Sequence, residues 1–236
     1  MARMIFFDGV ALESVASVMI DDVVVSPVTF EELARPRSIY PGTEFVRSRA
    51  ASRTVSITFA LLSDDMNSRQ ASLMAIRKWA KTDREYVLQL PGHPDHFLNA
   101  VCTSQPNASL RQWWEANLSI VFTCFSDPYW NDRIEKSISC GSTFTVLGDA
   151  PPVMRIERTV SGSAASNQSY TLDNRTMTFS SIPVGSMVID LNKQTAAVGS
   201  SSIMGNYNVN SKFLIPRTGT QVISGTGTVK YRERWE

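Results

Sequence analysis

The segment Phe122-Thr-Cys-Phe-Ser-Asp-Pro-Tyr-Trp130 sets the strongest limit on how this chain folds. Apolar residues alternate with polar ones in the run that leads into it, residues 117–124, and this period of two is typical of a half-buried β-strand. Asp127-Pro128 then ends the strand, because proline has no N–H for the ladder and restricts the residue before it. We therefore expect one domain to close here and a second to begin.

Composition supports two domains in a chain of 236 residues. We predict an N-terminal domain over residues 1–133 and a C-terminal domain over residues 134–236, since no helix signal remains after about Ile134. Charged residues are 19% of the chain, against roughly 25% in soluble domains, which is compatible with surface buried between subunits. The net charge of +1 argues against a dedicated nucleic-acid or membrane-surface binder.

The N-terminal domain reads as a β-sheet with one helix. Strict alternation in Val55–Leu61 predicts a strand. Good N-cap residues at 63–65 precede an apolar stripe at Leu73, Ile76 and Ala80, which predicts a helix with one buried face. Further strands are expected at 4–7, 18–25 and 111–125, and a hairpin joins 86–90 to 96–102 around a Pro-Gly-rich turn at 91–95.

An arginine-rich arm is predicted over Arg35–Arg53, with arginines at positions 35, 37, 47, 49 and 53. Two prolines and a glycine disfavour a helix, and the alternation is too poor for a strand with one buried face, so we expect an extended loop. Apolar side chains beside the arginines suit a subunit interface. Phosphate contact with DNA and a simply solvated basic loop remain open alternatives. The candidate interface residues of the arm are Arg35, Arg37, Ile39, Tyr40, Phe45, Arg47 and Arg49.

Trp113 completes the set of candidate interface residues. It shares a strand face with Asn117 and Ser119, whereas Trp114 shares the apolar face of Leu118. An exposed tryptophan can anchor an interface, stack on a sugar or lie half covered at a sheet edge, and the sequence leaves these three interpretations open.

The C-terminal domain reads as all β. Short apolar segments separated by turn residues at fairly regular spacing predict a β-sandwich. The expected strands are 154–160, 170–172, 177–179, 187–191, 196–198, 213–216, 220–224 and 228–235, with a small-residue turn region at 161–169.

Catalytic chemistry is poorly represented in the sequence. The only histidines, His93 and His96, share one predicted turn, and neither a Gly-x-Ser-x-Gly motif nor a phosphate-binding P-loop is present. A metal site on His93, Asp95, His96 and Cys102 is conceivable from the His-x-x-His spacing, but the two prolines explain the segment as a turn. We therefore predict no catalytic residues, no metal ligands and no cofactor.

Cysteine usage and the N-terminus favour a protein made in a cytoplasm. The apolar run Met4–Phe7 is too short for a signal peptide or a membrane-spanning segment. The three cysteines at 102, 124 and 140 fit reduced thiols, and Cys124 falls in the apolar row of its strand.

Three segments together resemble the distal tail protein (Dit) family of long-tailed, non-contractile bacteriophages. The strand and Asp-Pro-Tyr of 122–130 are similar to the closure of that family's N-terminal domain. Gly185-Ser-Met-Val-Ile-Asp190 is similar to its glycine, apolar strand and aspartate, and 210–235 resembles its ending, in which an apolar strand and proline precede a Gly-rich turn and a strand of alternating aromatic and basic residues.

The resemblance implies a fold and a role. The fold is an N-terminal β-domain with one helix and an arm, followed by a galectin-like β-sandwich. The role is a structural hub: a homohexameric ring that joins the tail tube to the tail tip or baseplate, contacts tube and tail-tip proteins, and passes the tape-measure protein and DNA through its lumen. The expected location is a virion tail assembled in the host bacterial cytoplasm, in a phage or a prophage. The alternative is a carbohydrate-binding module that attaches to host-surface glycans.

Overall fold

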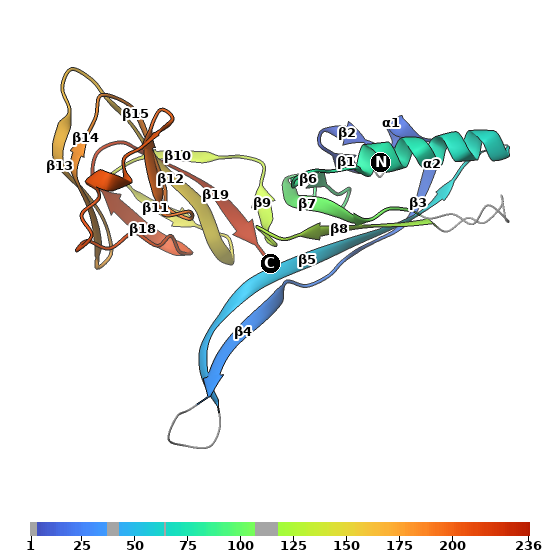
Figure 1. The fold of residues 1–236 in the computed structure, drawn as a ribbon, viewed down its shortest axis with the longest axis horizontal. Coiled ribbons are helices and arrows are strands. Elements are labelled where there is room, and N and C mark those ends of the chain that lie inside the picture. Colours follow the sequence, from blue (N-terminus) through green and yellow to red (C-terminus); the bar gives the residue numbers. More distant parts are fainter. Residues whose placement is uncertain (1–3, 37–42, 64, 107–117) are drawn as a thin grey trace. The chain divides into compact units, whose positions relative to one another are not determined.

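The computed structural model of the chain describes residues 4–36, 43–63, 65–106 and 118–236, with side chains described outside residues 35–48. The backbone contacts divide the chain into two compact units, Met1–Trp130 with Glu236, and Asn131–Trp235. Strands dominate both units, and the prediction of a mainly β chain is confirmed (Figure 1).

The first unit is built on one antiparallel sheet. Its strands pair in the spatial order β3-β5-β8-β7-β6-β1-β2. Their bounds are β1 Phe6–Phe7, β2 Val10–Ala11, β3 Val18–Val25, β5 Thr43–Leu61, β6 Tyr86–Gln89, β7 His96–Ser104 and β8 Leu118–Cys124, and β4 Thr29–Pro36 extends alongside β5. Strand β9, Trp130–Asp132, begins at the last residue of the unit.

One face of this sheet carries the core of the first unit. Val55, Ile57 and Phe59 on β5 are fully buried, as their alternation predicts. Helix α2, Met66–Ala80, lies along this face (Figure 1) and buries the predicted stripe that ends in Ile76 and Ala80. A further helix of four residues, α1 Leu12–Val15, was not predicted because it is too short to show a helical period.

The start of α2 agrees with its sequence signal. Asp65 is the N-cap, and its side chain accepts a hydrogen bond from the backbone N–H of Ser68 at 2.8 Å. This bond satisfies one of the N–H groups that the first helical turn leaves without an intrahelical partner. The same bond is the main cause of a lowered pKa for the Asp65 carboxyl.

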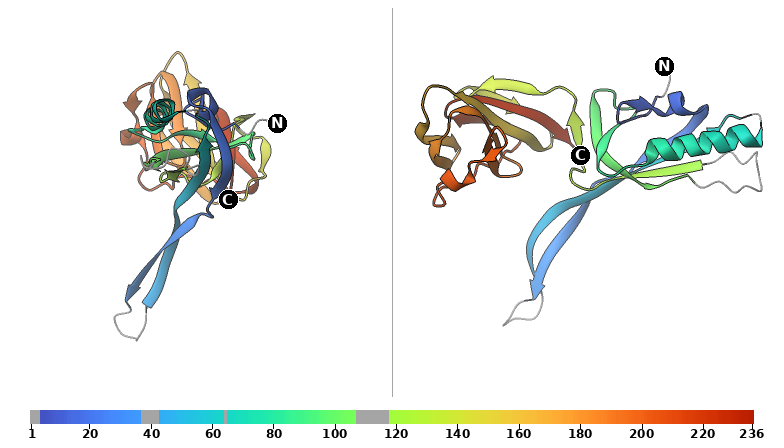
Figure 2. Two further views of the ribbon diagram at one scale, coloured as in Figure 1. Left: turned by 90° about the vertical axis from the view of Figure 1, so that its right-hand side faces the viewer. Right: turned by 45° about the horizontal axis from the view of Figure 1, so that its top comes forward.

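The prediction of a loop at 35–53 is wrong. Strands β4 and β5 pair antiparallel from Thr29 opposite Ser52 to Pro36 opposite Thr43. The segment projects from the sheet of the first unit as a two-stranded ribbon (Figure 2). The described side chains at 30–34 and 49–50 are exposed or half-buried, so they show no alternation of apolar and polar residues from which a strand could be predicted. Residues 37–42 lie outside the described residues.

The second unit is a β-sandwich. One sheet has the order β17-β16-β15-β12-β19-β10 and the other β11-β18-β13-β14. The strands are β10 Lys136–Ser139, β11 Thr143–Val146, β12 Ala150–Val160, β13 Ala165–Leu172, β14 Arg175–Ile182, β15 Gly185–Asp190, β16 Thr195–Val198, β17 Ser201–Ser202, β18 Gly219–Ser224 and β19 Thr228–Trp235, with a 3-10 turn η1 at Met204–Asn206. Ile156 and Val229 from the first sheet meet Phe179 and Ile223 from the second in the core, so the predicted sandwich is confirmed.

Two local predictions for this unit are wrong. The segment 213–216 is not a strand, although Phe213 and Leu214 are buried in the core. It is held instead by the Arg175 guanidinium, whose Nη1 donates to the Phe213 carbonyl at 3.4 Å, and Pro216 has no N–H for a ladder. The region 161–169, predicted as a turn, contains the beginning of β13 at Ala165, because small polar residues there pair with β14.

The turn between β18 and β19 tolerates no side chain at Gly225. Its φ is +136°, and a Cβ there would collide with the ring of Tyr170. We expect Gly225→Ala to destabilise the sandwich by about 1–3 kcal/mol through strain and overpacking. Gly141→Ala is the matched control, since Gly141 has φ +88° but no atom within 4 Å of the position that a Cβ would occupy. Thermal unfolding of both variants measures the difference, and equal losses would contradict the packing argument.

Candidate functional site: the ribbon and a polar groove

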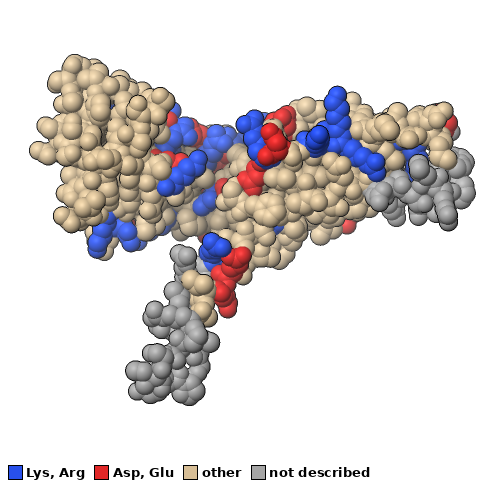
Figure 3. Space-filling model, viewed as in Figure 1, with Lys and Arg blue, Asp and Glu red and all other residues tan. Residues whose placement is uncertain are grey.

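The base of the ribbon exposes apolar and charged side chains together. Phe30 and Leu33 on β4 are 51% and 52% exposed, although both are large apolar residues. Beside them Arg49 Nη2 on β5 lies 2.6 Å from Glu31 Oε2 on β4, and Arg49 Nε donates to the same oxygen at 2.8 Å. Acidic and basic side chains lie next to each other on this described part of the ribbon (Figure 3). Apolar anchors among paired charges are the composition of an interface rim and core.

Only part of the predicted interface set falls within the described residues. The backbones of Arg35, Phe45 and Arg47 lie in β4 and β5, opposite Glu44, Ala34 and Leu33 respectively, and their side chains are outside the description. Arg37, Ile39, Tyr40 and Trp113 lie outside the described residues altogether. Arg49 is placed in full and forms the pair with Glu31. The role of these eight residues therefore stays a prediction.

Glu31 was missed by the sequence analysis. Its carboxylate is the partner of Arg49 across the ribbon, and the two residues are Cα partners in the antiparallel register. The sequence contains the acidic pair Glu31-Glu32, but it does not show which basic residue the pair meets. That becomes clear only from the hairpin register, which places Glu31 opposite Arg49. The pair is exposed and contributes roughly 0–1 kcal/mol to the stability of the fold, so its main effect is to orient the two side chains.

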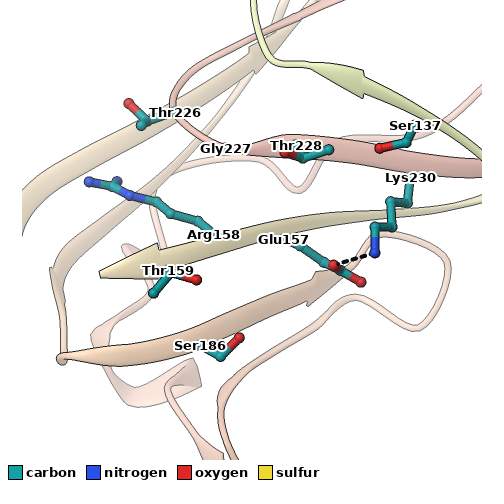
Figure 4. A pocket seen from close by; sticks show the side chains of 9 residues that line it. All are labelled: Ser137, Glu157, Arg158, Thr159, Ser186, Thr226, Gly227, Thr228 and Lys230. Atoms are coloured by element: carbon teal, nitrogen blue, oxygen red, sulfur yellow. Dashed lines mark ion pairs between the residues drawn. The ribbon is translucent and has the colours of Figure 1, made fainter. Parts of the chain in front are cut away.

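A polar groove lies on the outer face of the larger sheet of the sandwich. It is a shallow, open depression with a volume of about 590 Å³. Figure 4 shows side chains from β10, β12, β15 and β19 around it. The lining residues are Ser137, Glu157, Arg158, Thr159, Ser186, Thr226, Gly227, Thr228 and Lys230. The alternation of β12 and β19 places Glu157, Thr228 and Lys230 outward and Ile156 and Val229 in the core. Arg158 leaves β12 on the same side as Ile156, opposite Met187, and its Nη1 donates to Gln168 of the second sheet.

An ion-pair network orients the charged side chains of this sheet face. Glu157 Oε2 lies 2.8 Å from Lys230 Nζ, and Glu157 Oε1 lies 2.7 Å from Arg155 Nε. The Arg155 Nη1 atom continues to Glu135 Oε1 at 2.8 Å. The hydrogen bond from Lys230, followed by that from Arg155, lowers the pKa of Glu157. Such a network is better defined than isolated surface pairs because Glu157, Arg155 and Glu135 are each held by two partners.

The lowered pKa of Glu157 predicts a pH dependence. Its ion pairs stabilise the folded state at pH values above the ordinary pKa of 4.5, and this contribution is lost as the pH falls through the lower folded-state pKa. We therefore expect the stability of the wild-type sandwich to fall more steeply below about pH 4.5 than that of Glu157→Gln. Thermal unfolding between pH 3 and 7 measures both slopes. Identical slopes would show that Glu157 contributes no such linkage.

The histidine turn packs as a structural element. The His93 ring lies on Trp130 with centroids 4.3 Å apart, and the His96 ring centroid is 6.3 Å from that of His93. Burial, followed by His96 and Arg53, lowers the pKa of His93. Burial also raises the pKa of the Cys124 thiol to about 12, so this cysteine stays protonated. Among the described residues no group of three or more His, Cys, Asp or Glu side chains is arranged to hold a metal ion.

The described part of the chain contains no helix that is both long and apolar enough to cross a membrane.

The chain combines an antiparallel sheet covered by a helix, a projecting two-stranded ribbon and a β-sandwich. This combination defines a distinct class of mainly β protein. Among solved structures the chain is similar to the Dit protein (gp 19.1) of phage SPP1, described as a paradigm of the hub adsorption apparatus in phages that infect Gram-positive bacteria. The TM-score is 0.76 at 13% sequence identity, and the match covers 100% of both chains. The chain therefore has the fold of a phage distal tail protein.

A weaker similarity is to a chain of the phage P2 baseplate in its activated conformation with Ca. The TM-score is 0.48 at 6% identity, and the match covers 99% of this chain and 98% of the other. Neither a protein-family model nor a curated protein sequence matches the chain.

Proposed function

We propose that this chain is a structural hub protein at the distal end of a long non-contractile phage tail, where a ring of it joins the tail tube to the tail tip or baseplate. The observation that carries the proposal is the full-length match to a Dit hub protein, which spans the first unit, the ribbon and the sandwich together. Fold alone does not define function, so the three sequence segments that resemble the family add independent support.

The first unit is the part proposed to form the ring. Its ribbon exposes Phe30 and Leu33 beside the Arg49–Glu31 pair, a mixture that favours contact with a neighbouring subunit. The further interface residues proposed are those of the arm and Trp113. A closed ring requires a heterologous interface, in which a ribbon on one subunit meets a different surface on the next. Six subunits, tube and tail-tip partners, and a lumen for the tape-measure protein and DNA follow from the family resemblance.

A non-enzymatic role is part of the proposal. Burial keeps Cys124 protonated, and the ring of His93 packs against that of Trp130, so both side chains have structural roles. The proposed location is the virion tail, after assembly in the host bacterial cytoplasm.

The direct test is imaging of the purified protein alone and with the tail tube protein of the same tail. We expect six-fold rings, at least at high protein concentration or on a tube end, because a tube end can act as a template for the ring. A tail in which this layer has three-fold symmetry or none contradicts the ring of six. A tail in which labelled protein is found away from the distal end contradicts the hub role.

A further inference from the structure

The two faces of the ribbon base differ in charge. The register of β4 and β5 places Glu31 opposite Arg49. Because successive side chains of a strand point to opposite faces, Leu33 lies on the face of this pair, whereas Phe30 and Glu32 lie on the other. On the first face the acid and the base neutralise each other through their ion pair. The second face, Phe30 with Glu32, is called the acidic ribbon face below.

The acidic ribbon face presents an apolar group beside a free charge. Both side chains are exposed, and among the described residues the Glu32 carboxylate has no ion-pair partner. Figure 3 shows acidic side chains on this described part of the ribbon. An exposed phenylalanine next to an unneutralised carboxylate is complementary to a surface on which an apolar side chain lies next to a cation.

Helix α2 carries that complementary pattern on its outer face. The helix buries the stripe that ends in Ile76 and Ala80, so the side chains on the opposite side of its axis face solvent. These include Met74, which is 61% exposed, and the exposed lysines Lys78 and Lys81 just after it. The helix contains no Asp or Glu, and neither lysine has an ion-pair partner among the described residues. This set of three residues is called the basic helix face, and Figure 3 shows Lys and Arg side chains over α2.

The two faces match in spacing as well as in charge. Residues two apart in a strand, such as Phe30 and Glu32, are about 6.6 Å apart along the strand. Residues four apart in a helix, such as Met74 and Lys78, are about 6 Å apart along the axis. The phenylalanine ring can therefore contact the methionine thioether while the carboxylate accepts a charge-assisted hydrogen bond from the ammonium group.

Within one subunit the two faces point to different surroundings. The ribbon projects from the sheet, and its base lies away from α2 in every view (Figures 1 and 2). A subunit therefore does not cover its acidic ribbon face with its own helix. A closed ring joins two different surfaces of successive subunits, and this pair of complementary faces meets that requirement.

We propose that the acidic ribbon face of one subunit docks on the basic helix face of a second copy of this chain, the next subunit in the ring. Phe30 packs against Met74, Glu32 pairs with Lys78, and Lys81 adds positive potential one turn further along the helix. This inference rests on the proposed ring, and it names the surface that receives the ribbon.

Charge reversal on both sides of the contact tests the pairing in the full-length protein. Glu32→Lys and Lys78→Glu each place like charges opposite each other, so each should raise the protein concentration needed for ring formation at least about tenfold. The double variant restores opposite charges and should recover most of this loss. Glu32→Lys combined with Arg217→Glu, a reversal in the second unit where Arg217 pairs with Asp173, should recover none. Light scattering and negative-stain images, with and without tube ends, measure assembly, and thermal unfolding verifies that each variant is folded.

Chemical cross-linking tests the contact without reversing a charge. Subunits that carry both Glu32→Cys and Lys78→Cys, treated with a short bismaleimide on assembled rings, should give a ladder of covalent oligomers. The wild type, with its native cysteines, and each single variant should give none.

The outcomes separate this contact from the ring itself. Wild-type protein that forms no ring even on a tube end overturns the hub proposal and this inference with it. Rings of normal stability in Glu32→Lys, a double variant no better than its weaker parent, or no ladder in assembled rings overturn this inference alone. Loss of tube binding by Glu32→Lys with its rings intact also overturns it, because the acidic ribbon face then meets the tube protein.

Discussion

Replacing Phe30–Ala50 by a short Gly-Ser turn is expected to leave a folded subunit that no longer forms rings. Thr29 and Ser52 remain as the closing pair, and Thr29 Oγ1 still donates to the Ser52 carbonyl at 2.8 Å. The described side chains of the deleted part are exposed or half-buried, whereas the core begins at Val55 on the same strand. Stability should therefore change little while the interface is lost. Light scattering and negative-stain images, with and without the tube protein, measure the assembly state.

A matched pair of point variants makes the same test without a deletion. Arg49→Glu places two carboxylates opposite each other on the ribbon, and Arg217→Glu does the same at the exposed Arg217–Asp173 pair of the sandwich. Each pair is worth roughly 0–1 kcal/mol, so both proteins should fold. We expect only Arg49→Glu to weaken ring formation. Rings of wild-type stability in the deletion variant would show that the ribbon is a solvated hairpin.

Phe122→Ala is expected to cause the largest loss of stability in the first unit, about 3–5 kcal/mol. Phe122 on β8 is fully buried, and its ring centroid lies 4.8 Å from that of Phe7 and 6.0 Å from that of Trp79 on α2. Truncation leaves a cavity where strand, helix and N-terminal segment meet. Hydrogen exchange of α2 and β8 under native conditions measures the loss within this unit alone.

Phe125→Ala is the control for that prediction. Phe125 lies three residues further along and is 57% exposed, and its backbone N–H, rather than its ring, is held by Glu85 Oε1 at 2.8 Å. Its truncation should change stability by roughly 0.5 kcal/mol or less. A loss as large as that of Phe122→Ala would mean that burial in the monomer does not explain the effect.

The elements predicted correctly from the sequence are those with one face buried in a core and the other exposed to solvent. Val55–Leu61, the stripe of α2 and the paired strands β6 and β7 each show a period that reflects one buried face. The ribbon escaped detection because its described side chains at 30–34 and 49–50 are exposed or half-buried on both faces, so they show no alternation, and its strands are defined by their pairing. The segment around Phe213 failed for the opposite reason, since a buried apolar run is compatible with coil as well as with strand.

The polar groove was equally hard to predict. Arg155, Glu157 and Lys230 stand at alternating positions of two strands, which shows that they share outward faces. Their meeting depends on β12 and β19 being neighbours in register, although the strands are more than sixty residues apart in sequence. Pairing between distant strands is set by the whole sandwich, and no local pattern encodes it.

The two glycines of the β18–β19 turn are fixed by close packing, whereas the side chains on the rim of the groove are free to vary. Gly225 lies under the Tyr170 ring and Gly227 lies on the backbone of Glu157, so the path of the chain there is fixed by steric fit. Thr159 and Ser186 on the rim are exposed and add nothing to the core. Selection can therefore alter the surface chemistry offered at the rim, one substitution at a time, while the underlying sandwich is inherited unchanged.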